Sequence, residues 1–387
     1  MSGTKRGTKI GTGDVSRFDQ KYNIYSRLSW DPKLKDLSEL HNGPHKGYAE
    51  DGYTLEDWAA CQAAWYVERA FGKGSVGIGD FGLFQWEPEQ DQFYKISRLA
   101  PGQKHTINNP LEMSHHIKRM AKFLGASSVG ICKVDERWIY SHRFHRETLE
   151  YSPFDIPVEF QNAIVMAHEM DYELIKSSPT YLSQAAVGDA YSAMPYVAGR
   201  LAHFIRILGY KAIPSGNDTA LSVPFAIDAG LGELGRNGLL ITYKFGPRVR
   251  LSKVFTNLPL VPDKPIEFGV SKFCETCGLC AEKCPGRAIN DGEPTYEGPN
   301  VSSSHGIYKW YTDGEKCEAF WMKKNRGNSC ANCIRVCPFN KPEGWLHTTA
   351  KFMVKNLPHL NRQMLWADKL CGYGSKTKAK DYWRKDA

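Results

Sequence analysis

The stretch that decides the architecture of this chain is "CETCGLCAEKCPGRAI", residues Cys274 to Ile289. Its four cysteines follow the spacing Cys-x2-Cys-x2-Cys-x3-Cys-Pro, which is too close for ordinary core packing. A second run, over residues 317–338, ends with the same x2 and x3 spacing before a proline. Eight of the 11 cysteines lie between Cys274 and Cys337. Such clustering favours metal ligation over a disulfide scaffold, whose bridges are spread through a small domain.

Both runs follow the pattern of bacterial two-cluster ferredoxins. In that pattern, the first three cysteines of a run hold one iron–sulfur cubane, and the fourth, before proline, reaches the other. We therefore predict two [4Fe–4S] clusters. The predicted ligands are Cys274, Cys277, Cys280 and Cys337 for cluster 1, and Cys284, Cys317, Cys330 and Cys333 for cluster 2. Zinc sites and disulfides are the alternatives, but a zinc ribbon uses paired Cys-x2-Cys knuckles without a third cysteine and a Cys-Pro at these offsets.

The composition of the whole chain is that of an ordinary globular protein with two or three domains. Of its 387 residues, 42% are hydrophobic and 24% are charged. The net charge of +8 is spread along the chain, and nothing resembles a nucleic-acid-binding module. No apolar run reaches the roughly 18 residues that a membrane-spanning helix requires. Because the two clusters occupy only about 65 residues, we expect their electrons to reach a ligand bound by the preceding region.

The region before the cysteines shows the periodicities of an α/β fold. Apolar residues at helical spacing predict helices at 55–71 and 110–124, and "NAIVMAHEM" predicts a buried strand. The segment "YSAMPYVAGRLAHFIRILGY" predicts a long amphipathic helix that begins at Tyr191. The predicted domains are a variable N-terminal segment (1–50), a ligand-binding α/β domain (51–265), the two-cluster module (266–345) and a helical tail packed on the core (346–387).

The order of these segments resembles that of the corrinoid-dependent reductive dehalogenases. The likeness covers residues 110–387 and is most specific over 191–338, including "PSGND", "FGPRVRLSKV", "CETCGLCAEKCP" and "CANCIRVCPFNKPEGW". It implies a nitroreductase-like α/β domain that holds a base-off cobalamin, followed by a ferredoxin-like module with two [4Fe–4S] clusters. It also implies an oxidoreductase that catalyses RX + 2e⁻ + H⁺ → RH + X⁻, with Co(I) supplied with electrons by the clusters. Whether cobalt attacks the halogen or the carbon is left open.

The resemblance assigns roles to three residues. Tyr191 matches the family's proton donor, Asn217 a polar partner in the pocket, and Arg250 the cation beside the tyrosine. An arginine next to a tyrosine stabilises the phenolate that proton transfer leaves behind. Three further assignments have core packing as their alternative: Met194 and Leu251 as contacts of the corrin face, and Trp321 in the substrate pocket.

Location and partners also follow from the resemblance. Exported members carry a twin-arginine leader, whereas only Lys5–Arg6 occurs here. We expect a mature chain on the outer face of the cytoplasmic membrane, held by a small anchor subunit and fed by a membrane electron donor. A cytoplasmic location is the alternative, and a homodimer is left open. Two other functions compete with dehalogenation of a small organohalide: an epoxyqueuosine reductase, and a non-catalytic two-cluster electron carrier.

Overall fold

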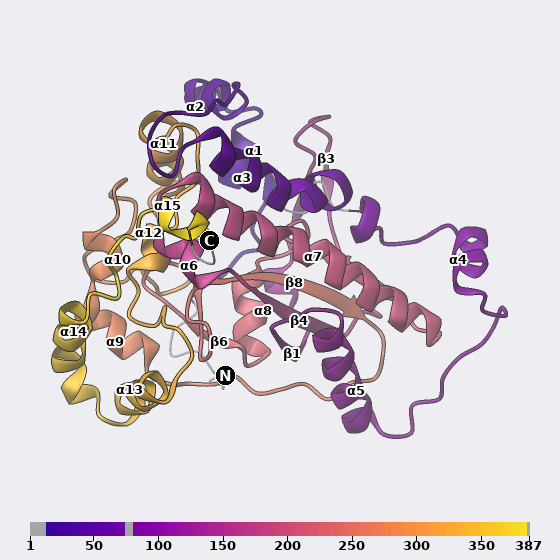
Figure 1. Ribbon diagram of the computed structural model, residues 1–387. Helices are drawn as coiled ribbons and strands as arrows, with labels where there is room; N and C mark the ends of the chain where they lie inside the picture. Colours follow the sequence, from indigo (N-terminus) through magenta and orange to yellow (C-terminus); the bar gives the residue numbers. More distant parts are fainter. Residues whose placement is uncertain (1–12, 74–79, 385–387) are drawn as a thin grey trace.

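A four-stranded antiparallel sheet forms the centre of the chain in the computed structural model, which describes residues 13–73 and 80–384 (Figure 1). The strand order is β1–β4–β8–β5, and every neighbouring pair is antiparallel. The strands are β1 Ser128–Lys133, β4 Asn162–Glu169, β5 Ala212–Ser215 and β8 Val249–Thr256. The buried strand predicted at "NAIVMAHEM" is confirmed as β4, which is central in the sheet and buried along nearly its whole length.

Side chains alternate across this sheet, so its two faces build two separate apolar cores. The covering helices are α5 Pro110–Phe123, α7 Tyr181–Ile207 and α8 Ser222–Asp228. On one face, Ile164 of β4 and Val254 of β8 share a core with residues of α5 and α7. On the other face, Phe255 of β8 packs edge-on against Phe225 of α8. Odd- and even-numbered positions on β8 therefore enter different cores. The helix predicted at 110–124 is confirmed as α5.

The long helix α7 begins at Tyr181, so the predicted start at Tyr191 is wrong. Thr180 caps the helix: its hydroxyl accepts from the Ser183 backbone, and the Ser183 hydroxyl accepts from the Thr180 backbone. Residues 181–190 are mostly small and buried, and a segment buried on several sides lacks the amphipathic pattern that marks a helix start. Tyr191 consequently lies in the middle of a 27-residue helix, where its backbone is firmly held.

A second helix, α3 (Leu55–Val67), packs along α7. It continues as a π-helical turn over Glu68–Gly72, which confirms the helix predicted at 55–71. Its first turn is fixed by a capping box between Thr54 and Asp57. Helix α7 covers the sheet, and the α3–α7 pair supplies one wall of the site described below.

The cysteine-rich region forms a helical end of the molecule, remote from α5 (Figure 1). Its helices are α9 Val270–Cys277, α10 Leu279–Glu282, α11 Gly314–Lys324 and α12 Asn332–Arg335. The N-terminal segment contributes α1 Ile24–Arg27 and α2 Lys35–His41, and α2 lies against α11. The buried Arg27 joins these parts through ion pairs with Asp31 (2.7 Å) and Glu315 (2.5 Å).

The C-terminal tail is helical, and its helices are α13 Trp345–Asn356, α14 Asn361–Leu370 and α15 Lys380–Trp383. It returns to the α/β core at α15, where the Trp383 indole donates to Asp57 of α3 (2.9 Å). The remaining elements are α4 Gln90–Ser97, α6 Tyr172–Lys176, and the hairpins β2 His142–Phe144 with β3 Tyr151–Pro153 and β6 Gly232–Leu234 with β7 Leu240–Thr242. Among the described residues, no helix is both long and apolar enough to cross a bilayer.

Candidate functional site

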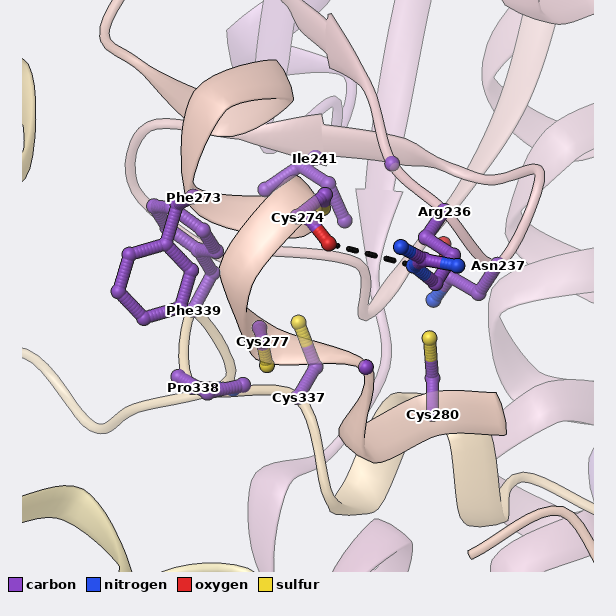
Figure 2. A pocket seen from close by; sticks show the side chains of 12 residues that line it. Arg236, Asn237, Ile241, Phe273, Cys274, Cys277, Cys280, Cys337, Pro338 and Phe339 are labelled. Atoms are coloured by element: carbon purple, nitrogen blue, oxygen red, sulfur yellow. Dashed lines mark hydrogen bonds between the residues drawn. The ribbon is translucent and has the colours of Figure 1, made fainter. Parts of the chain in front are cut away.

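The four cysteines predicted to hold cluster 1 line one pocket (Figure 2). Cys274 and Cys277 lie on α9, Cys280 on α10, and Cys337 just after α12. The rings of Phe273 and Phe339, among other residues, also line this pocket. Gly278 separates α9 from α10 with a φ of 62°, a conformation that glycine adopts without steric cost. This break turns the chain so that Cys280 faces the same space as the two preceding cysteines.

The other four cysteines form a second group. Cys317 of α11 lies within electrostatic range of Cys333, Cys330 and Cys284. Cys330 and Cys333 flank the start of α12, and Ser178, two residues before the cap of α7, is tied to this loop. The Ser178 hydroxyl accepts from the Ala331 backbone (2.9 Å) and donates to Asn332 Oδ1 (3.0 Å).

These thiols suit a metal cluster by chemistry as well as by position. All eleven cysteines are free thiols, so the eight in this region form no disulfide. Burial raises the pKa of Cys274 and Cys333 to about 12 and that of Cys330 to about 11. Such thiols keep their protons unless a bound metal displaces them. Within the described part of the chain, no three His, Cys, Asp or Glu side chains converge tightly enough for a single metal ion.

A buried arginine stands beside the cluster 1 cysteines. Arg236 donates from Nε to the Cys274 carbonyl (3.2 Å) and from Nη1 to the carbonyls of Asn290 and Gly292 (3.0 Å each). Its guanidinium also lies over the Trp310 ring, 4.4 Å from the centroid. The side chain thus fixes the loop around the pocket and places a positive charge next to four thiols, where it would stabilise an anionic cluster.

The structure brings the three residues predicted for catalysis together. Asn217 Nδ2 donates to the Tyr191 hydroxyl (3.3 Å), and the Arg250 guanidinium lies 5.1 Å from the centroid of the Tyr191 ring. Tyr191 comes from α7, Asn217 from the loop after β5, and Arg250 from β8. Arg250 is one of the even-numbered residues of β8, whose side chains point toward α7. This alternation brings Arg250 to Tyr191, although the two residues are 59 positions apart in the sequence.

Sequence reasoning missed Trp65 of α3, which stacks on Tyr191. The ring centroids are 4.9 Å apart and the planes are inclined by 22°. This close approach depends on Gly188 of α7, because a Cβ at that position would overlap the Trp65 indole. Trp65 belongs to the predicted helix at 55–71, but nothing local in the sequence distinguishes it from a core residue.

The N-terminal segment also reaches the site, through Tyr25 of α1. Burial raises the pKa of Tyr25 well above 10.0, and the nearby Glu318, Tyr191 and Cys317 raise it further. Its ring is 6.4 Å from that of Trp321, and the role of Trp321 in a substrate pocket stays a prediction. No pattern in residues 1–50 marks Tyr25, since its neighbours come from four distant parts of the chain.

Several buried donors around Tyr191 lack an acceptor. Among the described residues, the buried atoms Arg250 Nε, Trp65 Nε1 and Trp321 Nε1 have no hydrogen-bond partner. Buried polar groups are normally satisfied, so these donors fit a ligand that presents acceptors or negative charge. Arg250 is also within electrostatic range of Cys333, so the second cysteine group lies near the Tyr191 site.

The two residues predicted to contact the corrin face lie on different sides of the sheet. Met194 is fully buried on the α7 side, next to Phe84 and Gly216. Leu251 follows Arg250 on β8 and therefore points into the opposite core. Their contacts with a corrinoid stay predictions.

The fold and the cysteine groups first define an iron–sulfur protein. Residues 273–340 match the family model described as a 4Fe-4S double cluster binding domain. A tetrachloroethene reductive dehalogenase of Sulfurospirillum multivorans is 37% identical over 391 residues, covering 92% of this chain and 75% of its own. One from Dehalobacter restrictus is 38% identical over 400 residues, covering 87% and 70%.

These relatives show that the chain belongs to the reductive dehalogenases, which makes it an iron–sulfur and corrinoid-dependent oxidoreductase. A solved reductive dehalogenase, described as B12-dependent, superposes with a TM-score of 0.73 at 21% identity and matches 95% of this chain. That match confirms the predicted mixed α/β fold with its cluster module. The chain spans about half (48%) of the length of that solved protein. Family membership sets aside the two competing functions, the epoxyqueuosine reductase and the non-catalytic electron carrier.

Proposed function

We propose that this chain replaces a carbon-bound halogen by hydrogen in a small organohalide, in the reaction RX + 2e⁻ + H⁺ → RH + X⁻. Chlorinated ethenes are the first candidates, because the two relatives described above are named for tetrachloroethene. The observation that carries the proposal is the contact of Tyr191 with Asn217 and Arg250, beside buried donors that have no partner among the described residues. The aromatic walls Trp65 and Tyr25 favour a small apolar substrate.

The cysteine groups would hold two [4Fe–4S] clusters in series. The pocket formed by Cys274, Cys277, Cys280 and Cys337 supports the assignment of cluster 1. The proximity of Cys317 to Cys284, Cys330 and Cys333 supports that of cluster 2. Because Arg250 is within range of both Cys333 and Tyr191, cluster 2 is the one next to the substrate pocket. Electrons would then pass from cluster 1 to cluster 2 and on to the pocket.

The corrinoid, when bound, supplies the low-valent cobalt that reduces the carbon–halogen bond. The chain's own residues supply the proton and the electrostatic environment. Tyr191 would give its hydroxyl proton to the carbon as the halogen departs, and the Arg250 charge would stabilise the resulting phenolate. The free donors Arg250 Nε and Trp321 Nε1 are suited to acceptors on the leaving halide or on the cofactor.

We also propose that the protein works on the outer face of the cytoplasmic membrane, with a small anchor subunit and a membrane electron donor as partners. Exposed apolar side chains on α13 and α14 support a partner at the cluster end; they are Trp345, Phe352, Trp366 and Leu370. Helix α14 packs on α9, which carries two cluster 1 cysteines. Co-expression with the anchor subunit, followed by membrane fractionation, tests this: a chain that stays in the soluble fraction refutes it.

The proposed reaction is tested anaerobically on the holoenzyme. Iron and corrinoid are quantified, and halide release from a panel of chlorinated and brominated compounds is measured with reduced methyl viologen. We expect about eight irons and one corrinoid per chain, together with halide release. Iron and corrinoid without halide release from any compound of the panel would refute the proposed reaction.

The catalytic assignment is tested with Tyr191→Phe, which removes only the hydroxyl. Loss of a proton donor lowers kcat by about 100-fold or more, while iron and corrinoid contents stay at wild-type levels. Tyr196→Phe is the matched control, since Tyr196 is an exposed tyrosine on the same helix, and it should retain full activity. Wild-type turnover by Tyr191→Phe would remove Tyr191 from the mechanism.

A further inference from the structure

A fully buried lysine lies against the loop that carries Asn217. Lys253 of β8 has no exposed surface, and its ammonium donates to the Gly216 carbonyl (2.6 Å) and to the Ser222 hydroxyl (2.8 Å). The nearby Asp218 is also buried and accepts from the Gly216 backbone (2.6 Å). Burying a charged lysine is costly, so its position here needs an explanation that the catalytic residues alone do not give.

The lysine begins a chain of hydrogen bonds that ends on Tyr191. The Ser222 hydroxyl donates to Asn217 Oδ1 (3.1 Å), and Asn217 Nδ2 donates to the Tyr191 hydroxyl (3.3 Å). The Asn217 backbone is held separately, since its carbonyl accepts from the Tyr140 hydroxyl (3.2 Å). The backbone at Asn217 is therefore fixed. Only the side-chain amide of Asn217 can still rotate, and this rotation decides whether its oxygen or its NH₂ group faces Tyr191.

The donor and acceptor of each hydrogen bond between Lys253 and Tyr191 follow from the chemistry of Lys253. An ammonium has donors only, so Ser222 must accept from it and turn its own hydrogen toward Asn217. Asn217 Oδ1 receives that hydrogen, which leaves the NH₂ end of the amide to face Tyr191. The Tyr191 oxygen accepts this bond, and its own proton stays free to point into the pocket.

The direction of these bonds depends on the charge of the lysine. Burial lowers the pKa of Lys253 from 10.5 to about 8, against the opposing effect of Asp218. A neutral amine keeps two N–H bonds, and two acceptors are present: the Gly216 carbonyl and the Ser222 hydroxyl. The ammonium fixes the orientation of Ser222, whereas the neutral amine also has a lone pair that can accept from the Ser222 hydroxyl.

We propose that Lys253 and Ser222 are positioning residues that orient the Asn217 amide, so that Tyr191 accepts from the protein and keeps its proton for the substrate. This inference rests on the proposed function of Tyr191 as proton donor. Without the Ser222 hydroxyl the amide can rotate and accept the tyrosine proton on Oδ1, which withdraws that proton from the reaction.

The test compares Ser222→Ala with Ser222→Thr, which restores a hydroxyl on the same carbon. In the holoenzyme, Ser222→Ala should lower kcat by roughly 10-fold with KM nearly unchanged, and its solvent deuterium isotope effect should rise because proton transfer becomes slower. Ser222→Thr should recover most of the wild-type kcat. Ser222→Cys, with a weaker donor, should fall between them and serves as a second variant if the alanine protein is unstable.

A spectroscopic measurement separates this inference from the proposed function. The C–O stretch of Tyr191, identified by difference against Tyr191→Phe, reports whether the phenol accepts or donates a hydrogen bond. We expect an accepting phenol in the wild type and in Ser222→Thr, and a donating one in Ser222→Ala, whether or not the protein dehalogenates the compounds tested. An unchanged Tyr191 band in Ser222→Ala, or a kcat that Ser222→Thr does not recover, would overturn the proposal.

Discussion

Acid should destabilise this protein through His168, which is buried on the central strand β4. Its Nε2 lies 2.8 Å from the Ser252 hydroxyl, and its Nδ1 has no partner among the described residues. Burial lowers the pKa of His168 from 6.5 to about 4, because the charged ring would lose its hydration. Between these two values, the unfolded chain binds a proton at this residue that the folded chain does not.

The sign and size of the effect follow from this difference in proton binding. A depressed folded-state pKa gives stability that is present above pH 6.5 and is lost as the pH falls toward 4. At 1.36 kcal/mol per pKa unit, the complete loss is about 3 kcal/mol, and about 2 kcal/mol of it falls between pH 7.5 and pH 5.0. That loss is a large fraction of the stability of a typical domain.

The assay compares the wild type with His168→Gln by anaerobic denaturant unfolding at pH 7.5 and pH 5.0. Glutamine keeps a polar group near Ser252 but does not titrate, so the variant should lose about 2 kcal/mol less than the wild type over this interval. Acid damage to the clusters affects both proteins equally and cancels in the comparison. His116→Gln, at an exposed position on α5, should behave as the wild type. Equal losses in the wild type and His168→Gln would refute the reasoning.

Two further predictions concern the cluster module and its contact with the core. If Cys337 serves the same cluster as Cys274, the double variant Cys274→Ser/Cys337→Ser should retain about four irons, and Cys330→Ser/Cys337→Ser should retain almost none. The reverse iron contents would show that each run holds its own cluster. Gly246 has a φ of 57°, and a Cβ there would collide with the backbone of the cluster module, so Gly246→Ala should lower unfolding free energy by at least about 2 kcal/mol. Gly102→Ala, with a φ of 78° and open space around it, should cost about 1 kcal/mol; equal effects would contradict the collision.

The sequence was informative wherever the chemistry depends on local spacing. The x2 gaps predict which thiols of the first run lie together, because a short loop directs them toward the same space, and the fourth cysteine was assigned from the two-cluster ferredoxin pattern. The strand at "NAIVMAHEM" was equally evident, since a continuous apolar run of this length suits a strand buried on both faces. The start of α7 was missed because its first turns contain small residues on every side, without the polar face that marks a helix.

The walls of the pocket could not be predicted in this way. Tyr25 and Trp65 reach Tyr191 from elements more than 100 residues away, through packing that no local pattern records. The alternation of side chains on a strand could have separated Leu251 from Arg250 before the fold was known, because neighbouring strand positions face opposite sides. The hydrogen bonds from Lys253 to Asn217 likewise depend on a loop conformation that the letters "PSGND" do not specify.

The hydrogen bonds of Ser178 with Ala331 and Asn332 limit how this protein can be engineered. They join the entrance of the helix that carries Tyr191 to the loop that carries Cys330 and Cys333. The iron–sulfur module consequently cannot be exchanged for another ferredoxin without loss of these contacts, although its cysteine pattern is that of a free-standing ferredoxin. A chimera with a foreign ferredoxin over 266–345 would have to reproduce this loop to keep the spacing between cluster 2 and the helix that carries Tyr191. Reductive dehalogenases with exchanged modules should therefore lose turnover before they lose iron.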